Sequence, residues 1–526
     1  MELRALAAAS LALAFLAAAP PAVAAELERP ASDTVAPRGF TMTAREAGAI
    51  ARRDEKVRAA GERHPDLRPT VYTRGPGRWQ VSWFVGDDEV VQVSVDDRTG
   101  GILESWTGHQ VAWRMARGYE GAFGKKWNSP WILFPLGLLF LLPFVDFRRP
   151  LRLLHLDLLM LLAFGVSHVL FNRGEIGLSV PLAYPVLLYV LGRMLWEGWR
   201  RRERPGELVP HVPVGLLLAA LGFLVGFRIG LNVIDSNVID VGYSGVIGAD
   251  RIADGDPLYD GEFADDNESG NVYGPVAYLT YLPWEQLLPW KGAWDDLPAA
   301  HAAAIAFDLA TVAGLYVLGR RLAGRVLGVA LAYAWAAFPY TLFALATNSN
   351  DTLVAALLVW ALVAASSPAG RGALIAFASA AKFAPLALAP LFAALGRPLR
   401  FAAAFALMAA VVVIGFLPDG GLRDFYDTTL GFHAGRESPF SVWGQEPGLD
   451  WLHTVVKVAA AGLAVALAFL PRERDTVQTA ALGAAALIAL QLATVHWFYL
   501  YVVWFAPFVL VALFAAQRAR RSPVPA

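Results

Sequence analysis

An apolar run of membrane length, "VPVGLLLAALGFLVGFRIGL", is soon followed by the aspartate-rich stretch "DVGYSGVIGADRIADGDPLYDG". A carboxylate at the end of a membrane helix is costly, and it lies where water-borne and lipid-borne molecules meet. We therefore expect Asp240 to take part in catalysis, with Asp235 as the alternative carboxylate. The later aspartates lie among Gly and Pro, where short polar side chains more commonly cap helices or make turns; they are Asp250, Asp254, Asp256 and Asp260.

A single lysine, Lys382, interrupts an apolar part of the chain. It separates "GALIAFASAA" from "APLALAPLF". Together these stretches are too long for one membrane span and too short for two comfortable ones, which predicts a broken pair of helices near residues 372–395. A lysine at such a break is costly unless it is paired or faces a cavity. The alternative is that its ammonium group simply reaches the membrane interface.

The composition predicts a polytopic α-helical membrane protein. The chain has 526 residues, of which 56% are hydrophobic and only 17% charged, and its mean hydropathy is +0.46. These values are too apolar for a soluble enzyme of this size. Cysteine is absent, which excludes disulfides, thiolate metal sites and cysteine nucleophiles. The formal net charge of -1 gives no indication of nucleic-acid binding.

The first 25 residues have the pattern of a cleavable signal peptide. A basic start at Arg4 is followed by a short apolar core and a small-residue end, Ala22-Val23-Ala24. The alternative is an uncleaved first helix. In either case the next segment is expected outside the cytoplasmic membrane.

Residues 26–125 predict a small extracytoplasmic α+β domain. "TAREAGAIARRDEKVRAAGERH" has the pattern of an amphipathic helix, and "RWQVSWFVG" and "EVVQVSVDDRTGGILESWTG" alternate apolar and polar residues as strands do. The helix and the "VSVDDRTGGILE" hairpin resemble a PepSY-type domain. Such domains are generally linked to inhibition or regulation, so the resemblance implies regulation or partner contact, with a passive cap as the alternative.

From Trp131 onward, apolar runs predict about thirteen transmembrane helices. Basic clusters such as "DFRRPLR", "RRRERPGE" and "QRARR" all fall on one side, which places the C-terminus in the cytoplasm of a bacterial cell and residues 231–298 and 418–450 outside. Residues 271–290 are interrupted by prolines, so we expect short interfacial helices there, or else a re-entrant segment. The predicted spans lie near residues 130–146, 153–171, 179–198, 210–230, 299–319, 326–346, 352–367, 372–395 as a broken pair, 400–417, 451–470, 476–495 and 497–516.

Several fragments between residues 210 and 516 resemble polyprenyl-phosphate-sugar-dependent glycosyltransferases of the GT-C superfamily, particularly glycosyltransferase family 87. The first outer loop has a suitable spacing from Asp240 to "GDPLY". "YGPVAYL", "NSNDTLVAALLVWAL", "AAKFAPLALAPL" and "HWFYLYVVWFAPFVL" follow in the order that the family shows. Two features depart from the pattern. Residues 126–209 add membrane helices before the expected catalytic loop, and two residues separate Lys382 from Pro385.

The resemblance implies inverting transfer of a sugar from a polyprenyl-phosphate donor to a glycolipid or glycan acceptor on the outer face. Asp240 would be the general base, because an attacking hydroxyl group must lose its proton. Fixed cations or N–H donors would stabilise the leaving phosphate. The candidates for contacting donor or acceptor are Lys382, His433, Arg436, His496, Tyr243, Tyr259, Asn348 and Asn350.

Several of these candidates also have a purely structural alternative. Arg436 would be a solvated loop residue, His496 an interface residue, and Asn350 a helix cap. We expect no metal and no cofactor, because neither a regular ligand spacing nor a phosphate-binding or dinucleotide-binding motif is present. Two other classes remain open, a secondary transporter with repeated halves and a non-catalytic scaffold or regulator that uses the exported domain.

Overall fold

The computed structural model describes residues 27–118, 124–200, 204–205, 210–260, 263, 267–292, 294, 297–515 and 517–518. The chain divides into two compact units, Met1–Ala122 and Phe123–Ala526, and each is described by itself. The predicted signal peptide, residues 1–25, lies outside the described residues.

The first unit packs two helices on an antiparallel sheet, with its strands in sequence order. The core contains Trp79, Val81 and Val93, which are fully buried against alanines of the first helix. The single predicted helix is in fact two, because the side chain of Asp54 accepts a hydrogen bond from Lys56 N (2.9 Å) and starts a new helix there. The elements are β1 (Leu27–Glu28), α2 (Ala44–Ala51), α3 (Glu55–Arg63), β2 (Arg68–Arg74), β3 (Arg78–Val85), β4 (Asp88–Asp96), β5 (Ile102–Thr107), α4 (His109–Ala112) and η1 (Arg114–Arg117).

The second unit is a helical bundle. Its N-terminal helices are α5 (Pro130–Leu141), η2 (Leu142–Phe144), α6 (Leu153–Phe171), α7 (Ile176–Trp199), α8 (Val214–Asp235), α9 (Asp240–Asp254), η3 (Glu268–Asn271), α10 (Val276–Leu279), α11 (Leu282–Leu287), α12 (Pro298–Ala323), α13 (Arg325–Ala337) and α14 (Pro339–Ala346). The later ones are α15 (Asp351–Val363), α16 (Pro368–Ala381), η4 (Ala384–Leu388), α17 (Ala389–Ala393), α18 (Pro398–Ile414), α19 (Leu422–Tyr426), the π-helix η5 (Asp427–Gly431), α20 (Phe432–Gly435), α21 (Val442–Gln445), η6 (Pro447–Leu449), α22 (Asp450–Ala466), α23 (Thr476–Ala493), η7 (Tyr499–Tyr501) and α24 (Val502–Ala515). The short strands β6 (Arg204–Pro205) and β7 (Gln517–Arg518) pair in parallel.

Five helices among the described residues, α6, α7, α8, α12 and α23, are long and apolar enough to cross a membrane. The pair α13 and α14 would make a sixth span, bent by 59° where Pro339 follows Phe338. Five further apolar helices are shorter than a usual span, so the count of about thirteen is not confirmed. They are Pro130–Phe144, Asp351–Val363, Ala384–Ala393, Pro398–Ile414 and Tyr499–Ala515.

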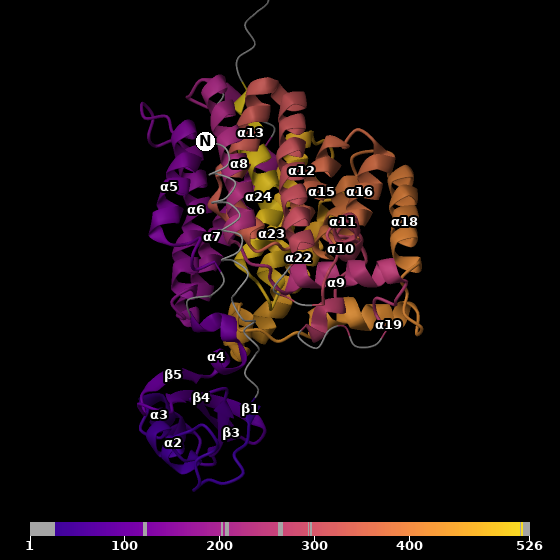
Figure 1. Cartoon of the computed structure of the whole chain (residues 1–526). Coiled ribbons are helices and arrows are strands. Elements are labelled where there is room, and N and C mark those ends of the chain that lie inside the picture. Colours follow the sequence, from indigo (N-terminus) through magenta and orange to yellow (C-terminus); the bar gives the residue numbers. More distant parts are fainter. Residues whose placement is uncertain are drawn as a thin grey trace, which may run out of the picture. The chain divides into compact units, whose positions relative to one another are not determined.

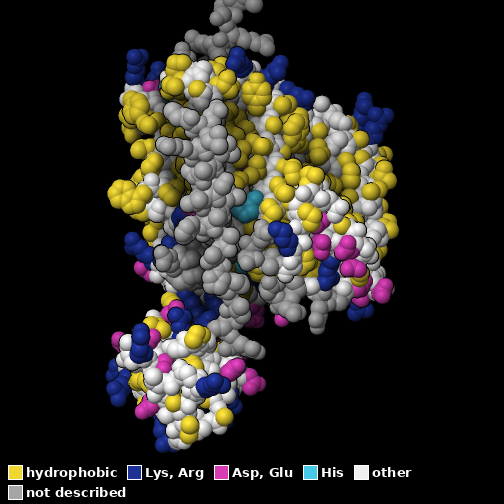
Figure 2. Space-filling model, viewed as in Figure 1, with side chains coloured by type: hydrophobic (Ala, Val, Ile, Leu, Met, Phe, Trp, Pro, Cys, Tyr) yellow, Lys and Arg dark blue, Asp and Glu magenta, His cyan; other side chains and the backbone are white. Residues whose placement is uncertain are grey.

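The bundle has an apolar exterior and an end rich in charge. α24 lies in its middle, and every residue of this helix is buried. Figure 1 shows α5–α7 on one side of α24, α16–α18 on the other, and α9 and α19 lying across one end. In Figure 2, apolar side chains cover most of the bundle, while Asp and Glu gather at the end that holds α9 and α19. The bundle therefore presents a membrane-facing surface with polar chemistry at its end.

Helix α9 is held close to its neighbours by a glycine. A Cβ atom on Gly242 would lie 2.3 Å from the backbone oxygen of Asn348, so only glycine allows this approach. On the same helix, Tyr243, Val246 and Ile247 enter a buried core shared with α10 and α12. This packing fixes the helix whose first residue is Asp240.

Candidate active site

Asp240 begins α9 at a fixed point of the backbone. The preceding residues pair with the turn after α14, because Asn237 N donates to Ala346 O (3.1 Å) and Ile239 N to Thr347 O (3.0 Å). The backbone of Asp240 thus has little freedom to move, while its side chain keeps an exposed surface.

Lys382 is buried at the predicted helix break and forms an ion pair. It ends α16, and its side chain is only 9% exposed. Its Nζ lies 2.7 Å from Oδ1 of Asp351. The same oxygen accepts a hydrogen bond from Trp504 Nε1 (2.8 Å), and Oδ2 of Asp351 accepts one from Ser349 Oγ (2.7 Å). A buried ammonium group needs such a partner. Asp351 was not among the predicted site residues, although the cost of an unpaired Lys382 called for a carboxylate nearby.

Three aromatic rings surround the ammonium group of Lys382. Its Nζ lies 5.8 Å from the ring centres of Tyr273 and Tyr501, and 5.3 Å from that of Trp504. Such distances allow cation–π attraction. Tyr273 reaches this position because its neighbour Gly274 packs on the backbone of Ala380, where a Cβ atom would lie 2.1 Å from the carbonyl oxygen.

Two histidines lie close to the same positive charges. Burial, aided by the charges of Arg436 and Lys382, lowers the pKa of His433 to about 4 and that of His496 to about 3. Both rings are therefore neutral at pH 7, and each can donate one hydrogen bond. His496 Nδ1 also lies 2.9 Å from Ser438 Oγ, which ties the segment before η7 to the outer segment that carries Arg436.

Asp240 shares this electrostatic environment. Burial raises the pKa of its carboxyl group, while the charges of Arg436 and Lys382 act to lower it and that of Asp351 acts to raise it. Its side chain is exposed by surface area, yet protein surrounds it on most sides. The surrounding protein atoms limit screening by bulk water, and this disfavours the charged form of the carboxyl group. The carboxylate of Asp240 is therefore accessible from solvent, and its pKa depends on the neighbouring charges.

The structure thus brings together residues from six separate parts of the chain. We name the group the Asp240 cluster. It consists of Asp240, Tyr273, Asp351, Lys382, His433, Arg436, His496 and Tyr501. Five of these residues were predicted from the sequence as site residues, whereas Tyr273, Asp351 and Tyr501 were not predicted.

Other predicted site residues have different surroundings. The side chain of Asp235 is 54% exposed at the end of α8 and pairs with Lys126. Tyr243 is buried in the core of α9 beside Trp294. Tyr259 contributes indirectly, since its hydroxyl group donates to the carbonyl oxygen of Tyr273 (2.8 Å).

The two predicted asparagines differ from one another. Asn348 is a structural link, because its Nδ2 donates to Ser236 Oγ (2.9 Å) and Asn237 O (3.0 Å), and its Oδ1 accepts from Asn232 (2.6 Å). Asn350 is 1% exposed, and both polar atoms of its side chain lack a partner among the described residues. A buried amide in this state calls for a water molecule or a ligand group, and it directly precedes Asp351.

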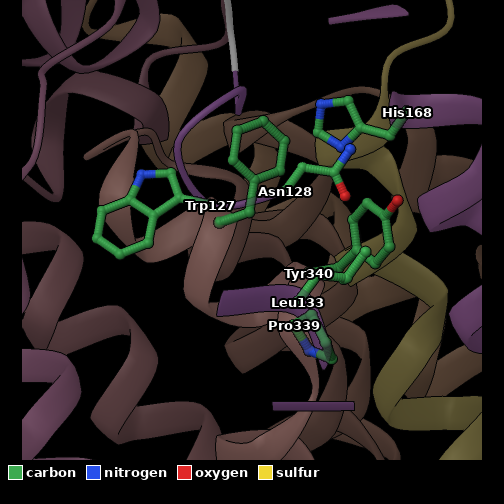
Figure 3. Close-up of a pocket in the computed structure, with 7 residues that line it drawn as sticks. Trp127, Asn128, Leu133, His168, Pro339 and Tyr340 are labelled. Carbon is green, nitrogen blue, oxygen red and sulfur yellow. The ribbon is translucent and has the colours of Figure 1, made fainter. Parts of the chain in front are cut away.

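A small cavity lies away from the Asp240 cluster, between α6 and α14 (Figure 3). It is lined by aromatic, polar and apolar side chains. His168 and Tyr340 lie on its wall. Among the described residues, no group of three or more His, Asp or Glu side chains is arranged to hold a metal ion.

Comparison with known proteins gives one match. Residues 271–526 match the family model of Glycosyltransferase family 87. This part of the chain belongs to that family. The protein is therefore a glycosyltransferase of a membrane family, in agreement with its apolar helices. The match includes Lys382, His433, Arg436 and His496 but begins after Asp240. No curated protein matches the chain, and the PepSY-type resemblance of the first unit is not confirmed.

Proposed function

We propose that this membrane glycosyltransferase transfers a sugar from a polyprenyl-phosphate donor to an envelope glycolipid or glycan, with inversion at the anomeric carbon, at the extracytoplasmic face of a bacterial plasma membrane. The observation that carries the proposal is the Asp240 cluster itself. It combines one reachable carboxylate with Lys382 and Arg436 at the polar end of a membrane bundle. A base and fixed cations are what displacement of a phosphate by a hydroxyl group requires.

In the proposed reaction, Asp240 takes the proton of the acceptor hydroxyl group. The hydroxyl oxygen forms a bond to the anomeric carbon, while the bond from this carbon to the phosphate oxygen breaks. The polyprenyl phosphodiester thereby becomes a monoester and gains a negative charge. One base suffices for a single displacement, which inverts the anomeric configuration.

The growing charge on the phosphate would be stabilised by the rest of the cluster. Arg436 can bind two phosphate oxygens at once, and Lys382 supplies a second positive charge. The neutral ring of His496 can donate an N–H group without adding like charge beside the two cations, while the ring of His433 already bonds the backbone of Val272. Asn350 supplies a buried amide for a sugar hydroxyl group, since its polar atoms have no partner among the described residues.

The proposed orientation rests on the distribution of charge. Basic clusters in the sequence fall on one side of the predicted spans, and acidic side chains gather at the opposite, site-bearing end in Figure 2. The donor phosphate and the acceptor would therefore meet at the extracytoplasmic face.

The test uses the purified full chain in lipid nanodiscs. We expect transfer from polyprenyl-phosphate mannose or polyprenyl-phosphate arabinose to an envelope glycolipid, and no transfer from nucleotide sugars. NMR of the product would show the inverted anomeric configuration. Transfer from nucleotide sugars alone, or retention of configuration, would contradict the proposal.

A matched pair of arginine variants tests the phosphate site. Arg436→Gln removes the charge near Asp240, and Arg423→Gln removes a charge from the same outer segment, where the side chain is 89% exposed. We expect the KM for the donor to rise about tenfold or more only in the first variant, as loss of a hydrogen-bonded charge pair implies. Equal KM values in the two variants would remove Arg436 from the donor site.

A further inference from the structure

Helices α6 and α7 lie outside the family match, yet they contact the segments that carry the Asp240 cluster. We call residues 436–445 and residues 496–501 the two site segments. The first holds Arg436 and Ser438, and the second holds His496 and Tyr501. The bond between His496 and Ser438 (2.9 Å) joins them.

The first contact is made by two serines on one tyrosine. Tyr499 Oη lies 2.6 Å from Ser167 Oγ on α6 and 2.7 Å from Ser179 Oγ on α7. Ser167 donates its own hydrogen to the carbonyl oxygen of Ser179 (2.7 Å). Tyr499 must therefore donate to Ser167, which leaves Ser179 to donate to Tyr499. All three side chains are at most 2% exposed, so this network has no competition from solvent.

Ring stacking strengthens this contact. The ring of His168, from α6, lies parallel to that of Tyr499, with a centre-to-centre distance of 4.1 Å and an angle of 11°. Tyr340 also stacks on His168, with ring centres 5.9 Å apart, beside the cavity of Figure 3. Tyr499 is thus held both at its ring and at its hydroxyl group.

The second contact fixes the other site segment to α7. Val442 N donates to Tyr184 Oη (3.2 Å), and Gln445 Nε2 donates to Ile176 O (3.1 Å). The ring of Tyr184 also meets the edge of Trp443. Since these bonds are independent of Tyr499, α7 holds both site segments at once.

We propose that α6 and α7 are positioning elements of the transferase site, with Ser167, Ser179 and Tyr499 as positioning residues that fix His496, Tyr501 and Arg436 around the donor phosphate. The inference rests on the function proposed for the Asp240 cluster. A misplacement of about 1 Å in a catalytic arrangement can lower the rate about 10²-fold. The helices that precede the family match would therefore be required for turnover as well as for anchoring.

Two tyrosine variants test this role. Tyr499→Phe removes the bonds to Ser167 and Ser179. Tyr333→Phe is the matched control, because its hydroxyl group makes a similar bond from α13 to Leu139 O (2.8 Å). We expect Tyr499→Phe to lower kcat about tenfold or more at nearly constant thermal midpoint, and Tyr333→Phe to leave kcat unchanged.

The outcomes separate the positioning role from the function itself. Transfer by the unmodified chain with equal kcat in the two variants would overturn the positioning role and leave the proposed function standing. No transfer by the unmodified chain would overturn both. Hydrogen exchange measured by mass spectrometry supplies a readout without substrate. Faster exchange in both site segments of Tyr499→Phe than of Tyr333→Phe supports the proposal, and identical exchange contradicts it.

Discussion

Two buried ion pairs in the bundle resemble each other closely and have different surroundings. In each pair, one carboxylate oxygen accepts a hydrogen bond from the cation and another from the indole N–H of a tryptophan. Arg228 lies 2.7 Å from Asp308 Oδ1, which also accepts from Trp335 (2.8 Å). Lys382 lies 2.7 Å from Asp351 Oδ1, which also accepts from Trp504 (2.8 Å). The pairs are alike in their first contacts, so their difference lies in what surrounds the cation.

Both Nη atoms of Arg228 donate further hydrogen bonds to the protein, while its Nε has no partner among the described residues. Arg228 bonds Ala336 O (3.0 Å), Thr341 Oγ1 (2.9 Å) and Thr341 O (3.2 Å). Lys382 instead faces aromatic rings, and its charge acts on Asp240, His433 and His496. The comparison teaches that a buried pair alone does not indicate function; a cation whose charge acts on other titratable groups does.

Replacing both members of each pair should give the largest difference. A well-packed apolar replacement of a buried ion pair is often neutral for stability. We expect Lys382→Met with Asp351→Leu to fold and to lower kcat about 10²-fold, as loss of a phosphate-stabilising charge implies. Arg228→Met with Asp308→Leu should keep kcat within about threefold, since this pair plays no part in the proposed reaction. Equal losses of kcat in the two double variants would erase the distinction between the pairs.

When the cation alone is replaced and stability is measured, the Arg228 pair should show the larger effect, whereas the Lys382 pair shows the larger effect on kcat. Arg228→Met leaves Asp308 buried without its cation and removes three further bonds, so we expect a loss of about 3–5 kcal/mol in unfolding free energy. Lys382→Met removes fewer hydrogen bonds and should cost less. Thermal unfolding in lipid or detergent would check this order, and a larger loss for Lys382→Met would be inconsistent with it.

A smaller effect is expected from Gly242→Ala. The added methyl group would meet the backbone oxygen of Asn348, which cannot move as a side chain can, so the start of α9 must shift. We expect kcat to fall about tenfold through displacement of Asp240. Gly222→Ala on α8 is the control, because a Cβ atom there meets nothing within 4 Å. If Gly242→Ala is as active as the control, the close packing of α9 against the backbone of Asn348 is not needed for activity.

The smallest predicted effect concerns pH. A general base acts when deprotonated, so kcat/KM should fall as the pH drops through the pKa of Asp240. Burial raises this pKa above its usual value of 3.8, and the charge of Arg436 acts to lower it. Removing that charge in Arg436→Gln should therefore move the acid limb of the profile to higher pH, by up to about one unit. An acid limb that moves to lower pH would contradict the assignment of the base.

The sequence predicted the ionic residues of the site better than their partners. Asp240, Lys382 and Arg436 were recognisable because charged residues are rare and costly beside a membrane; His433 and His496 were candidates from their places in the chain and from the family resemblance. The places of Asp351 and Tyr501 depend on which helices become neighbours, and Asp351 contacts both Lys382, 31 residues away, and Trp504, 153 residues away. Asp235 resembled Asp240 in sequence; in the structure Asp235 pairs with Lys126, whereas the charges of Arg436 and Lys382 act on Asp240.

The class of the fold could be predicted from the sequence, but the ends of individual helices and strands could not. Hydropathy predicted a helical membrane unit and a break at Lys382, which the structure has between α16 and η4. It did not predict how many helices are shorter than a membrane span. An apolar run can be divided into two helices, as the run that contains Pro339 is, and hydropathy alone does not show the division. In the first unit, strands β3 to β5 followed from alternation, whereas β2 (Arg68–Arg74) lacks a clear alternating pattern and was not predicted.

The central claim, that Asp240 is the base, is tested most directly by single-turnover transfer with Asp240→Asn and Asp235→Asn under saturating donor. The asparagine keeps the shape of the side chain and cannot accept the proton. We expect Asp240→Asn to bind the polyprenyl-phosphate donor as the unmodified chain does and to transfer about 10²–10⁴-fold more slowly, while Asp235→Asn transfers at the unmodified rate. Unimpaired transfer by Asp240→Asn, or an equal loss in Asp235→Asn, would contradict the account.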